Sequence, residues 1–306
     1  MSVLSNSRGH RRPGLPVVAA ALLILLAWWP EAAGGDTIVG EDIEYVVRKG
    51  DTIELVGARL GVDWRAIAKG NGIDIKSPLK KGQKLRVNTR RIVPLSTDNG
   101  ILINIPDRTL YLFKEGRLVT VVPVGLGKPP KKGDRNWGTP LGKFTIVRKE
   151  KNPSWYVPAS IQEEMAETGK EVKTIVPPGP ENPLGRYALK TSLQGILIHE
   201  TIWPSSVYQY RSHGCIRVMP EHMEQLFGKV EINTPGELVY MPVKAVVSDR
   251  GRVFLEARRD VYGKVKDLRH EAKVLLERLG MAGRVDWNKV DRVLKEKTGI
   301  PEDISS

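Results

Sequence analysis

The stretch R211-S-H-G-C-I-R217 holds the only cysteine of the 306-residue chain, two residues after a histidine. A lone cysteine is most often a small buried apolar residue. Two neighbouring features favour a catalytic role for this cysteine instead. Gly214 permits a tight turn that brings backbone N–H groups toward a reacting carbonyl. His213 and His199 are candidate bases for a cysteine nucleophile. On local spacing, a catalytic cysteine and a chance packing arrangement both stay open.

The N-terminus has the layout of an export signal. A polar, basic stretch comes before an apolar run at residues 15–29, and small residues follow at 32–35. The run of about 15 residues is shorter than the roughly 20 that a spanning helix needs. Residues 1–35 are therefore expected to be either a cleaved signal peptide or an uncleaved anchor in the inner membrane. In both cases the rest of the chain lies outside the cytoplasm, in the periplasm or cell envelope.

The amino-acid composition limits the classes of partner that this chain, if exported, is expected to bind. A single cysteine excludes an internal disulfide, so stability must come from hydrophobic cores. Lysine and arginine outnumber aspartate and glutamate by 48 to 35, a formal net charge of +13. Most of this charge is expected on a solvated surface, and the excess suits an anionic polymer or a membrane surface. The chain lacks a nucleic-acid-binding motif, so nucleic acid is not an expected partner.

Residues 45–88 predict a small strand–helix–helix–strand unit between two polar linkers. Helical spacing of apolar residues, a capping residue and terminal glycines carry the prediction. The expected features are a strand at 45–47, a helix capped by Asp51 or Thr52 and ended by Gly61, a short helix around Trp64, a strand at 85–87, and linkers at 36–44 and 90–99.

This unit resembles a LysM domain. The resemblance is carried by its aromatic–valine start, by G50-D-T52, by Asn71 and by the G82-Q83 pair before the last strand. It implies binding to glycans that contain N-acetylglucosamine, chiefly the glycan strands of peptidoglycan in bacteria. Asp51, Thr52 and Asn71 lie near the loops where such domains hold sugar, and they equally suit roles in maintaining the fold.

Residues 98–243 predict a mainly β domain, a sandwich or a barrel-like sheet, because many short alternating segments are separated by turn signals. Two short helices interrupt it. Ser160 and Glu163 read as a capping box for the first, and Pro220 and Gly228 bracket the second. Residues 244–306 predict a partly helical extension, with one hairpin, a helix stopped by Gly280 and a helix capped by Asp286.

Four motifs in this order resemble the YkuD-type L,D-transpeptidase family, in its ErfK-like branch. They are G138-T-P-L-G-K-F-T-I146, the proline- and glycine-rich residues 177–189, I198-H-E-T201 and S212-H-G-C-I-R217. The resemblance implies a β-sandwich or barrel-like catalytic domain behind the LysM unit. It also implies acyl transfer on the tetrapeptide stems of peptidoglycan, with no cofactor and no metal.

Carried over residue by residue, the resemblance implies Cys215 as nucleophile and His199 as its base, oriented by a backbone carbonyl. His213 is implied among the catalytic residues, either behind the reacting groups as a support or on the substrate side. The N–H groups of Gly214 and Cys215 are implied as oxyanion donors, with Tyr187 assisting. Arg217 is either a partner for a stem-peptide carboxylate or a structural arginine.

Two departures from the branch bear on specificity. Glu200 replaces a common glycine and is expected to place a carboxylate near the base. Y208-Q-Y210 is expected to reshape the lid of the pocket.

Several functions stay open at this stage. The acyl acceptor can be a second stem, which gives a 3→3 cross-link, an envelope protein, or water, which gives a carboxypeptidase. A zinc hydrolase with His199, His213 and Cys215 as ligands is one rival. A non-catalytic wall-binding protein that relies on its LysM unit is another.

Overall fold

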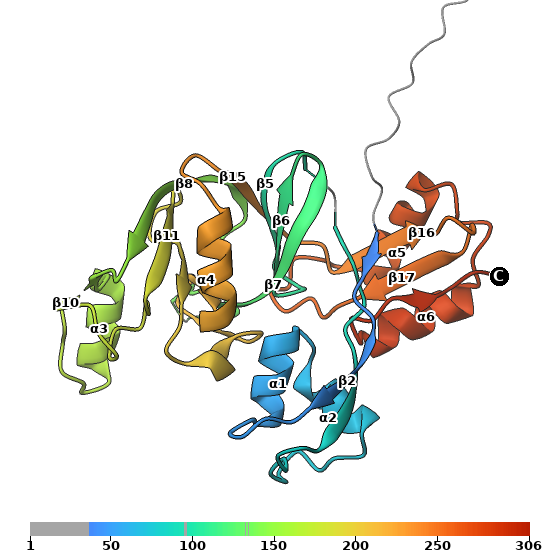
Figure 1. Cartoon of the computed structure of the whole chain (residues 1–306). Helices are drawn as coiled ribbons and strands as arrows, with labels where there is room; N and C mark the ends of the chain where they lie inside the picture. Colours follow the sequence, from blue (N-terminus) through green and yellow to red (C-terminus); the bar gives the residue numbers. More distant parts are fainter. Residues whose placement is uncertain (1–36, 95–96, 132, 134) are drawn as a thin grey trace, which may run out of the picture. The chain divides into compact units, whose positions relative to one another are not determined.

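The computed structural model describes residues 37–306 except 95–96, 132 and 134 (Figure 1). The predicted export segment, residues 1–35, lies outside the described residues. Across the part of the chain that is described, no helix is both long and apolar enough to span a membrane.

The predicted strand–helix–helix–strand unit is present. Strand β2 (Asp42–Val46) pairs antiparallel with β3 (Lys84–Asn88), and helices α1 (Ile53–Leu60) and α2 (Trp64–Gly70) lie between them in the chain. Thr52, rather than Asp51, caps α1, because its hydroxyl accepts the N–H of Leu55 at 3.2 Å. Buried side chains from all four elements form the core of this unit.

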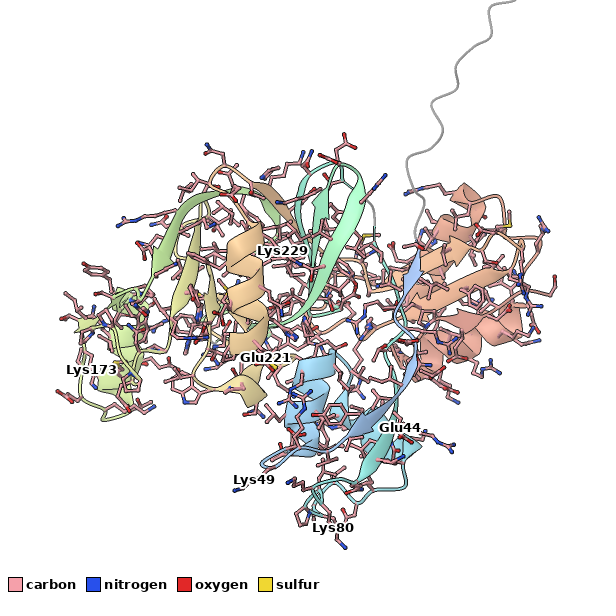
Figure 2. All side chains as sticks on the ribbon, viewed as in Figure 1. Glu44, Lys49, Lys80, Lys173, Glu221 and Lys229 are labelled. Atoms are coloured by element: carbon pink, nitrogen blue, oxygen red, sulfur yellow. The ribbon has the colours of Figure 1, made fainter. Side chains whose placement is uncertain are left out.

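The two predicted linkers contain paired strands. β1 (Ile38–Val39) pairs antiparallel with β4 (Arg91–Ile92). The Arg91 guanidinium donates to the carbonyls of Leu60 and Gly61 and to the Thr109 hydroxyl, each at 3.2 Å. These contacts tie the end of α1 to the strand that begins at Thr109. Arg59 of α1 also pairs with Glu221 at 3.2 Å. Figure 2 labels Glu221 close to α1.

The central region is mainly β, as predicted, and its sheet closes on itself. The strands run in the order β13-β7-β14-β12-β11-β8-β15-β5-β6, and β6 also pairs with β7. This last pairing closes the sheet into a barrel. The strands are β5 (Gly100–Asn104), β6 (Thr109–Lys114), β7 (Arg117–Gly127), β8 (Gly142–Lys151), β11 (Tyr187–Thr191), β12 (Leu197–Glu200), β13 (Tyr210–Ser212), β14 (Ile216–Val218) and β15 (Pro235–Val239).

Short elements decorate the barrel. They are β9 (Trp155–Tyr156), α3 (Ala159–Glu167), β10 (Ile175–Val176), the 3-10 turn η1 (Pro204–Ser206) and α4 (Pro220–Lys229). The predicted capping box on α3 is wrong, because the helix begins at Ala159 with Pro158 as its N-cap, two residues before Ser160, and no side chain caps it. Glu163 pairs with Arg135 at 2.9 Å instead. Helix α4 continues one residue beyond Gly228.

The C-terminal extension is a small sheet with two helices, so it contains more β structure than predicted. β16 (Val243–Val247), β17 (Val253–Ala257) and β18 (Glu302–Asp303) form an antiparallel sheet. Helices α5 (Leu268–Arg278) and α6 (Trp287–Glu296) share its hydrophobic core. As predicted, Asp286 caps α6. The returning strand β18 carries charged residues, which is why no apolar pattern marks it.

Candidate active site

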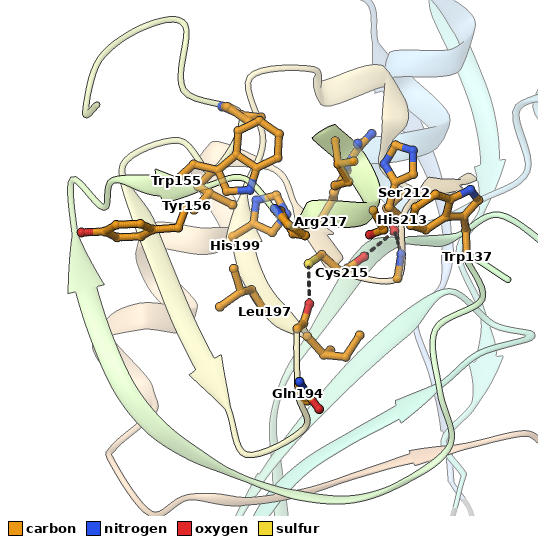
Figure 3. Close-up of a pocket in the computed structure, with 18 of the residues that line it drawn as sticks. Trp137, Trp155, Tyr156, Gln194, Leu197, His199, Ser212, His213, Cys215 and Arg217 are labelled. Atoms are coloured by element: carbon orange, nitrogen blue, oxygen red, sulfur yellow. Dashed lines mark hydrogen bonds between the residues drawn. The ribbon is translucent and has the colours of Figure 1, made fainter. Parts of the chain in front are cut away.

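Strand pairing brings the predicted nucleophile and base together. β12 and β14 are parallel neighbours, with Ile198 opposite Ile216 and His199 opposite Arg217. Cys215 immediately precedes β14, so the thiol and the imidazole project from adjacent strands into one cavity of about 950 Å³ (Figure 3). His213, Gly214 and Arg217 also line this cavity.

A tight turn presents the cysteine. Gly214 has φ of 109°, a conformation that side chains rarely adopt, so glycine is needed here. The Ser212 hydroxyl donates to the carbonyl of Cys215 at 2.6 Å and accepts the N–H of Gly214 at 3.2 Å. The Thr139 hydroxyl donates to the carbonyl of Gly214 at 2.9 Å. The Gly214 N–H is therefore already engaged by Ser212, and its implied role as an oxyanion donor requires that this bond be released.

The surroundings of the Cys215 thiol favour its protonated form. Burial raises its pKa, while a hydrogen bond from the Leu197 backbone and the charge of Arg217 act in the opposite direction. Sγ donates to the carbonyl of Gly195 at 3.4 Å. Because the thiolate is the reactive species, this cysteine needs a base to remove its proton.

His199 is a neutral imidazole with one nitrogen committed. Its Nδ1 lies 2.6 Å from the carbonyl oxygen of Glu200, the backbone contact that the resemblance implied. Nδ1 must carry the proton to donate to a carbonyl, so Nε2 keeps a free lone pair. Burial lowers the pKa of His199 to about 4. The side chain can therefore accept a proton throughout the neutral range.

The side chain of Glu200 turns away from the cavity. Its Oε1 accepts from Arg186 Nε at 3.1 Å, and it does not line the cavity. The expectation that this residue places a carboxylate near the base is wrong. The side chain of His199 on β12 points into the cavity. Because side chains alternate along a strand, that of Glu200, the next residue, lies on the other face of the sheet.

His213 lies at the rim of the cavity. Its Nε2 donates to Glu164 Oε2 at 2.7 Å, and its ring packs edge-on against Trp137 with centroids 4.5 Å apart. Burial lowers the pKa of His213, although the Glu164 carboxylate opposes this effect. His213 thus connects the cysteine turn to α3. Arg217 lies deeper, with its guanidinium 5.6 Å from the centre of the Trp203 ring.

Comparisons with known proteins identify the two domains. Residues 98–244 match the YkuD family, an L,D-transpeptidase catalytic domain, and residues 45–88 match the LysM domain. The chain carries a YkuD-type L,D-transpeptidase domain behind a LysM domain.

Two curated relatives align with this chain over about nine tenths of their own length. The probable L,D-transpeptidase ErfK/SrfK of Salmonella typhimurium is 29% identical over 288 residues, which cover 91% of each chain. The probable L,D-transpeptidase YcfS of Escherichia coli is 28% identical over 296 residues, 94% of this chain and 91% of the relative. Among solved structures, the Ldtfm–avibactam carbamoyl enzyme is 23% identical and covers 48% of this chain and 50% of its own, with a TM-score of 0.36.

The predicted contributions of three tyrosines to the L,D-transpeptidase cavity are wrong. These residues are Tyr187, Tyr208 and Tyr210. Tyr187 is absent from the lining of the cavity, and its ring packs on Phe227 of α4 at 4.8 Å. Tyr208 accepts a hydrogen bond from Arg258 at 2.6 Å, and the Tyr210 hydroxyl donates to a backbone carbonyl. Neither reshapes the lid, because both side chains point to the side of the barrel that faces the C-terminal extension.

The polar residues predicted to hold glycan in the LysM domain are committed to internal bonds. The Asp51 carboxylate accepts from the Tyr45 hydroxyl at 2.7 Å and from Arg59 at 3.0 Å. The Thr52 hydroxyl caps α1. The Asn71 amide donates to the carbonyls of Ile67 and Arg86 and accepts the N–H of Arg86. Their side chains therefore hold the fold of the domain.

Several lining residues were missed from the sequence. Large aromatic side chains form walls of the cavity, and acidic and basic groups share its surface. They are Trp137, Trp155, Tyr156, Trp203, Lys128, Glu150, Glu164 and Lys190. The sequence W155-Y156 beside prolines was an available signal for a pocket wall, because aromatic residues are common in ligand sites.

Proposed function

We propose that the chain is a cell-wall L,D-transpeptidase in which Cys215 forms a thioester with the tetrapeptide stem of peptidoglycan. The observation that carries the proposal is the pairing of a protonated thiol with a neutral imidazole in one cavity. The Glu200 carbonyl fixes Nδ1–H of His199 and leaves Nε2 as the proton acceptor. The family match supplies the class of reaction.

In the first step, the thiol turns from the Gly195 carbonyl toward His199. Nε2 takes the proton as Sγ attacks the carbonyl of the L-centre of diaminopimelate in the stem. Backbone N–H groups of the cysteine turn stabilise the oxyanion. The C–N bond to D-alanine then breaks, and the proton held by His199 passes to the departing amine. The products are free D-alanine and a Cys215 thioester.

In the second step, an amine attacks the thioester and restores the thiol. The amine of a second stem gives a 3→3 cross-link, and a lysine of an envelope protein gives a protein attached to the wall. Water in place of the amine makes the enzyme a carboxypeptidase. The cavity suits a stem peptide, since ammonium groups and carboxylates both line it beside aromatic walls.

Location follows from the same proposal. The substrate is outside the cytoplasm, so residues 1–35 act as an export signal, either removed or kept as an inner-membrane anchor. The LysM domain then holds the enzyme on glycan strands, which raises the local concentration of stems around the cavity.

The test is a mixture of purified protein with tetrapeptide monomers and dimers, read by mass spectrometry. Loss of D-alanine accompanied by a cross-linked product supports transpeptidation, and loss of D-alanine alone indicates carboxypeptidase action. No change in any muropeptide, with wall binding retained, would leave only a wall-binding protein.

Matched variants assign the chemistry. Cys215→Ala should abolish D-alanine release, and His199→Ala should lower the rate by about 10²–10⁴-fold. His222→Ala serves as control, because this partly buried histidine of α4 does not line the cavity. A carbapenem, as an acylating probe, should add its mass once to the wild type and not to Cys215→Ala. Turnover that survives in Cys215→Ala would reject the thioester.

A further inference from the structure

The C-terminal extension reaches the back of the cysteine turn through one side chain. Tyr262 follows β17 in the chain and is 8% exposed. Its hydroxyl donates to the carbonyl of Gly127 at 2.8 Å and accepts the N–H of Thr139 at 3.1 Å. Residues 127 and 139 belong to the barrel, so the hydroxyl joins the extension to the catalytic domain.

Thr139 links the Tyr262 hydroxyl to the turn that carries Cys215. Its hydroxyl accepts the N–H of Gly127 at 2.9 Å and donates to the carbonyl of Gly214 at 2.9 Å. Thr139 is 2% exposed, so these bonds do not compete with solvent. From the Tyr262 hydroxyl to the peptide that joins Gly214 and Cys215, the path consists of direct hydrogen bonds.

Tyr262 is itself held firmly. Its backbone N–H donates to the Tyr240 hydroxyl at 2.8 Å, and that hydroxyl donates to Asp260 at 2.5 Å. The Asp260 carboxylate also accepts the N–H groups of Lys264 and Val265, each at 2.9 Å. The Tyr262 ring lies between the rings of Tyr240 and Tyr210 at 5.9 and 5.8 Å. A turn built this rigidly can fix the position of a hydroxyl.

The segment of residues 137–139, which the Tyr262 hydroxyl holds through the Thr139 N–H, also forms a wall of the active site. A side chain added at Gly127 would meet the Trp137 carbonyl at 2.0 Å, so the chain around residue 138 lies directly on β7. Trp137 contacts His213, and Gly138 and Trp137 line the cavity. Movement of this segment would displace the cysteine turn and the rim histidine together.

We propose that Tyr262 is a positioning residue of the L,D-transpeptidase site. Its hydroxyl, acting through Thr139, holds the Gly214–Cys215 peptide in the geometry that the attack on the stem carbonyl requires. The family match ends at residue 244, so the catalytic domain as matched lacks a group that its own active site uses. Where turnover is the readout, this inference rests on the proposed function; where thiol reactivity is the readout, it does not.

The test compares Tyr262→Phe with Tyr210→Phe in the full chain. Both changes remove one buried hydroxyl from the same aromatic stack, but Tyr210 donates to Ile105, away from the turn. Misplacement of reacting groups by about 1 Å can cost about 10²-fold in rate. We expect Tyr262→Phe to lower kcat for D-alanine release by about 10–100-fold with KM changed less than about twofold, and Tyr210→Phe to change kcat less than about twofold.

Alkylation of Cys215 by iodoacetamide as a function of pH gives a second readout that needs no stem peptide. Burial raises the pKa of Cys215, so loosening the turn should move the midpoint of alkylation toward the ordinary thiol value in Tyr262→Phe and not in Tyr210→Phe. Thr139→Val should reproduce the effect, and Thr139→Ser, which keeps the hydroxyl, should not. The Tyr262→Phe/Thr139→Val double variant should fall no further than either single change.

The outcomes separate the two proposals. Equal kcat and equal alkylation midpoints for Tyr262→Phe and Tyr210→Phe would overturn the positioning role. A wild type without stem turnover would reject the proposed function, and a midpoint shift in Tyr262→Phe that is absent from Tyr210→Phe would still support the positioning role. Additive effects in the double variant would show that Tyr262 does not act through Thr139 and would overturn the inference.

Discussion

The buried imidazole of His199 predicts a reaction that tolerates acid. Burial lowers the pKa of this histidine to about 4, against about 6.5 for an exposed histidine. At pH of about 5.5, an exposed histidine is roughly 90% protonated, whereas a group with a pKa of about 4 is only about 3% protonated. A base with the ordinary pKa would lose about tenfold in rate between pH 7.5 and 5.5, whereas we expect His199 to lose almost none.

The same burial makes the folded protein sensitive to acid. Between a pH of about 6.5 and 4, the unfolded chain binds a proton at His199 that the folded chain does not bind. Stability therefore falls as the pH falls through this window and is recovered as it rises. The difference between about 6.5 and 4 corresponds to roughly 3 kcal/mol from this one side chain.

Two measurements check this reasoning. The first is kcat/KM for D-alanine release between pH of about 4.5 and 8 at constant ionic strength. The second is the free energy of unfolding of the wild type and of His199→Gln, from denaturant titrations over the same range. The variant should lose about 3 kcal/mol less stability than the wild type by pH 4. An acid limb near pH 6.5, or equal acid losses in both proteins, would show that His199 is not buried as a neutral base.

Three further substitutions probe other contacts. Lys244→Met should destabilise the fold by about 3–5 kcal/mol in thermal and denaturant unfolding, because it removes one of the two cations that pair with the buried carboxylates of Asp107 and Glu256. Lys84→Met, at an exposed pair, should leave the melting temperature unchanged. Glu164→Gln should raise KM about 2–5-fold by weakening the hold of α3 on the cavity rim, and Glu167→Gln, whose side chain does not line the cavity, should not. Asn71→Ala should speed hydrogen exchange in the LysM domain and destabilise it by about 1–3 kcal/mol, while peptidoglycan binding below the melting temperature stays within about twofold.

Elements with strong local signals could be predicted from the sequence. The helix from Thr52 to Gly61 has a capping hydroxyl, apolar residues at helical spacing and a left-handed glycine, and each of these acts within a few residues. Asp286 begins α6 for the same reason. The cysteine motif could be identified because Gly214 and Cys215 are adjacent. His199, on the neighbouring strand β12, was found through motif resemblance, since nothing local reveals which strands pair.

The incorrect expectations concern the direction in which side chains point and the strands or groups with which residues pair. Tyr187 and Glu200 lie on strands beside the cavity, but alternation sends their side chains to other faces, and the register that decides this comes from the whole sheet. The two-residue strands β1 and β4 are too short to carry a pattern, and they pair across more than 50 residues of chain. In the LysM domain, Asp51 and Asn71 could not be assigned from sequence, since a polar residue that holds a turn looks the same as one that holds a sugar.

The C-terminal boundary of the catalytic domain shows most clearly what the sequence alone does not reveal. Asp107 of the barrel is fully buried, and its cations, Lys244 at 2.7 Å and Arg258 at 3.7 Å, belong to the extension. A buried carboxylate without a cation costs several kcal/mol, so the barrel depends on residues beyond its own last strand. Tyr262 adds a dependence of the active site on the same segment. Because the extension has its own hydrophobic core, its sequence reads as a separate unit, and only the buried charges and one hydroxyl show that the catalytic domain is incomplete without it.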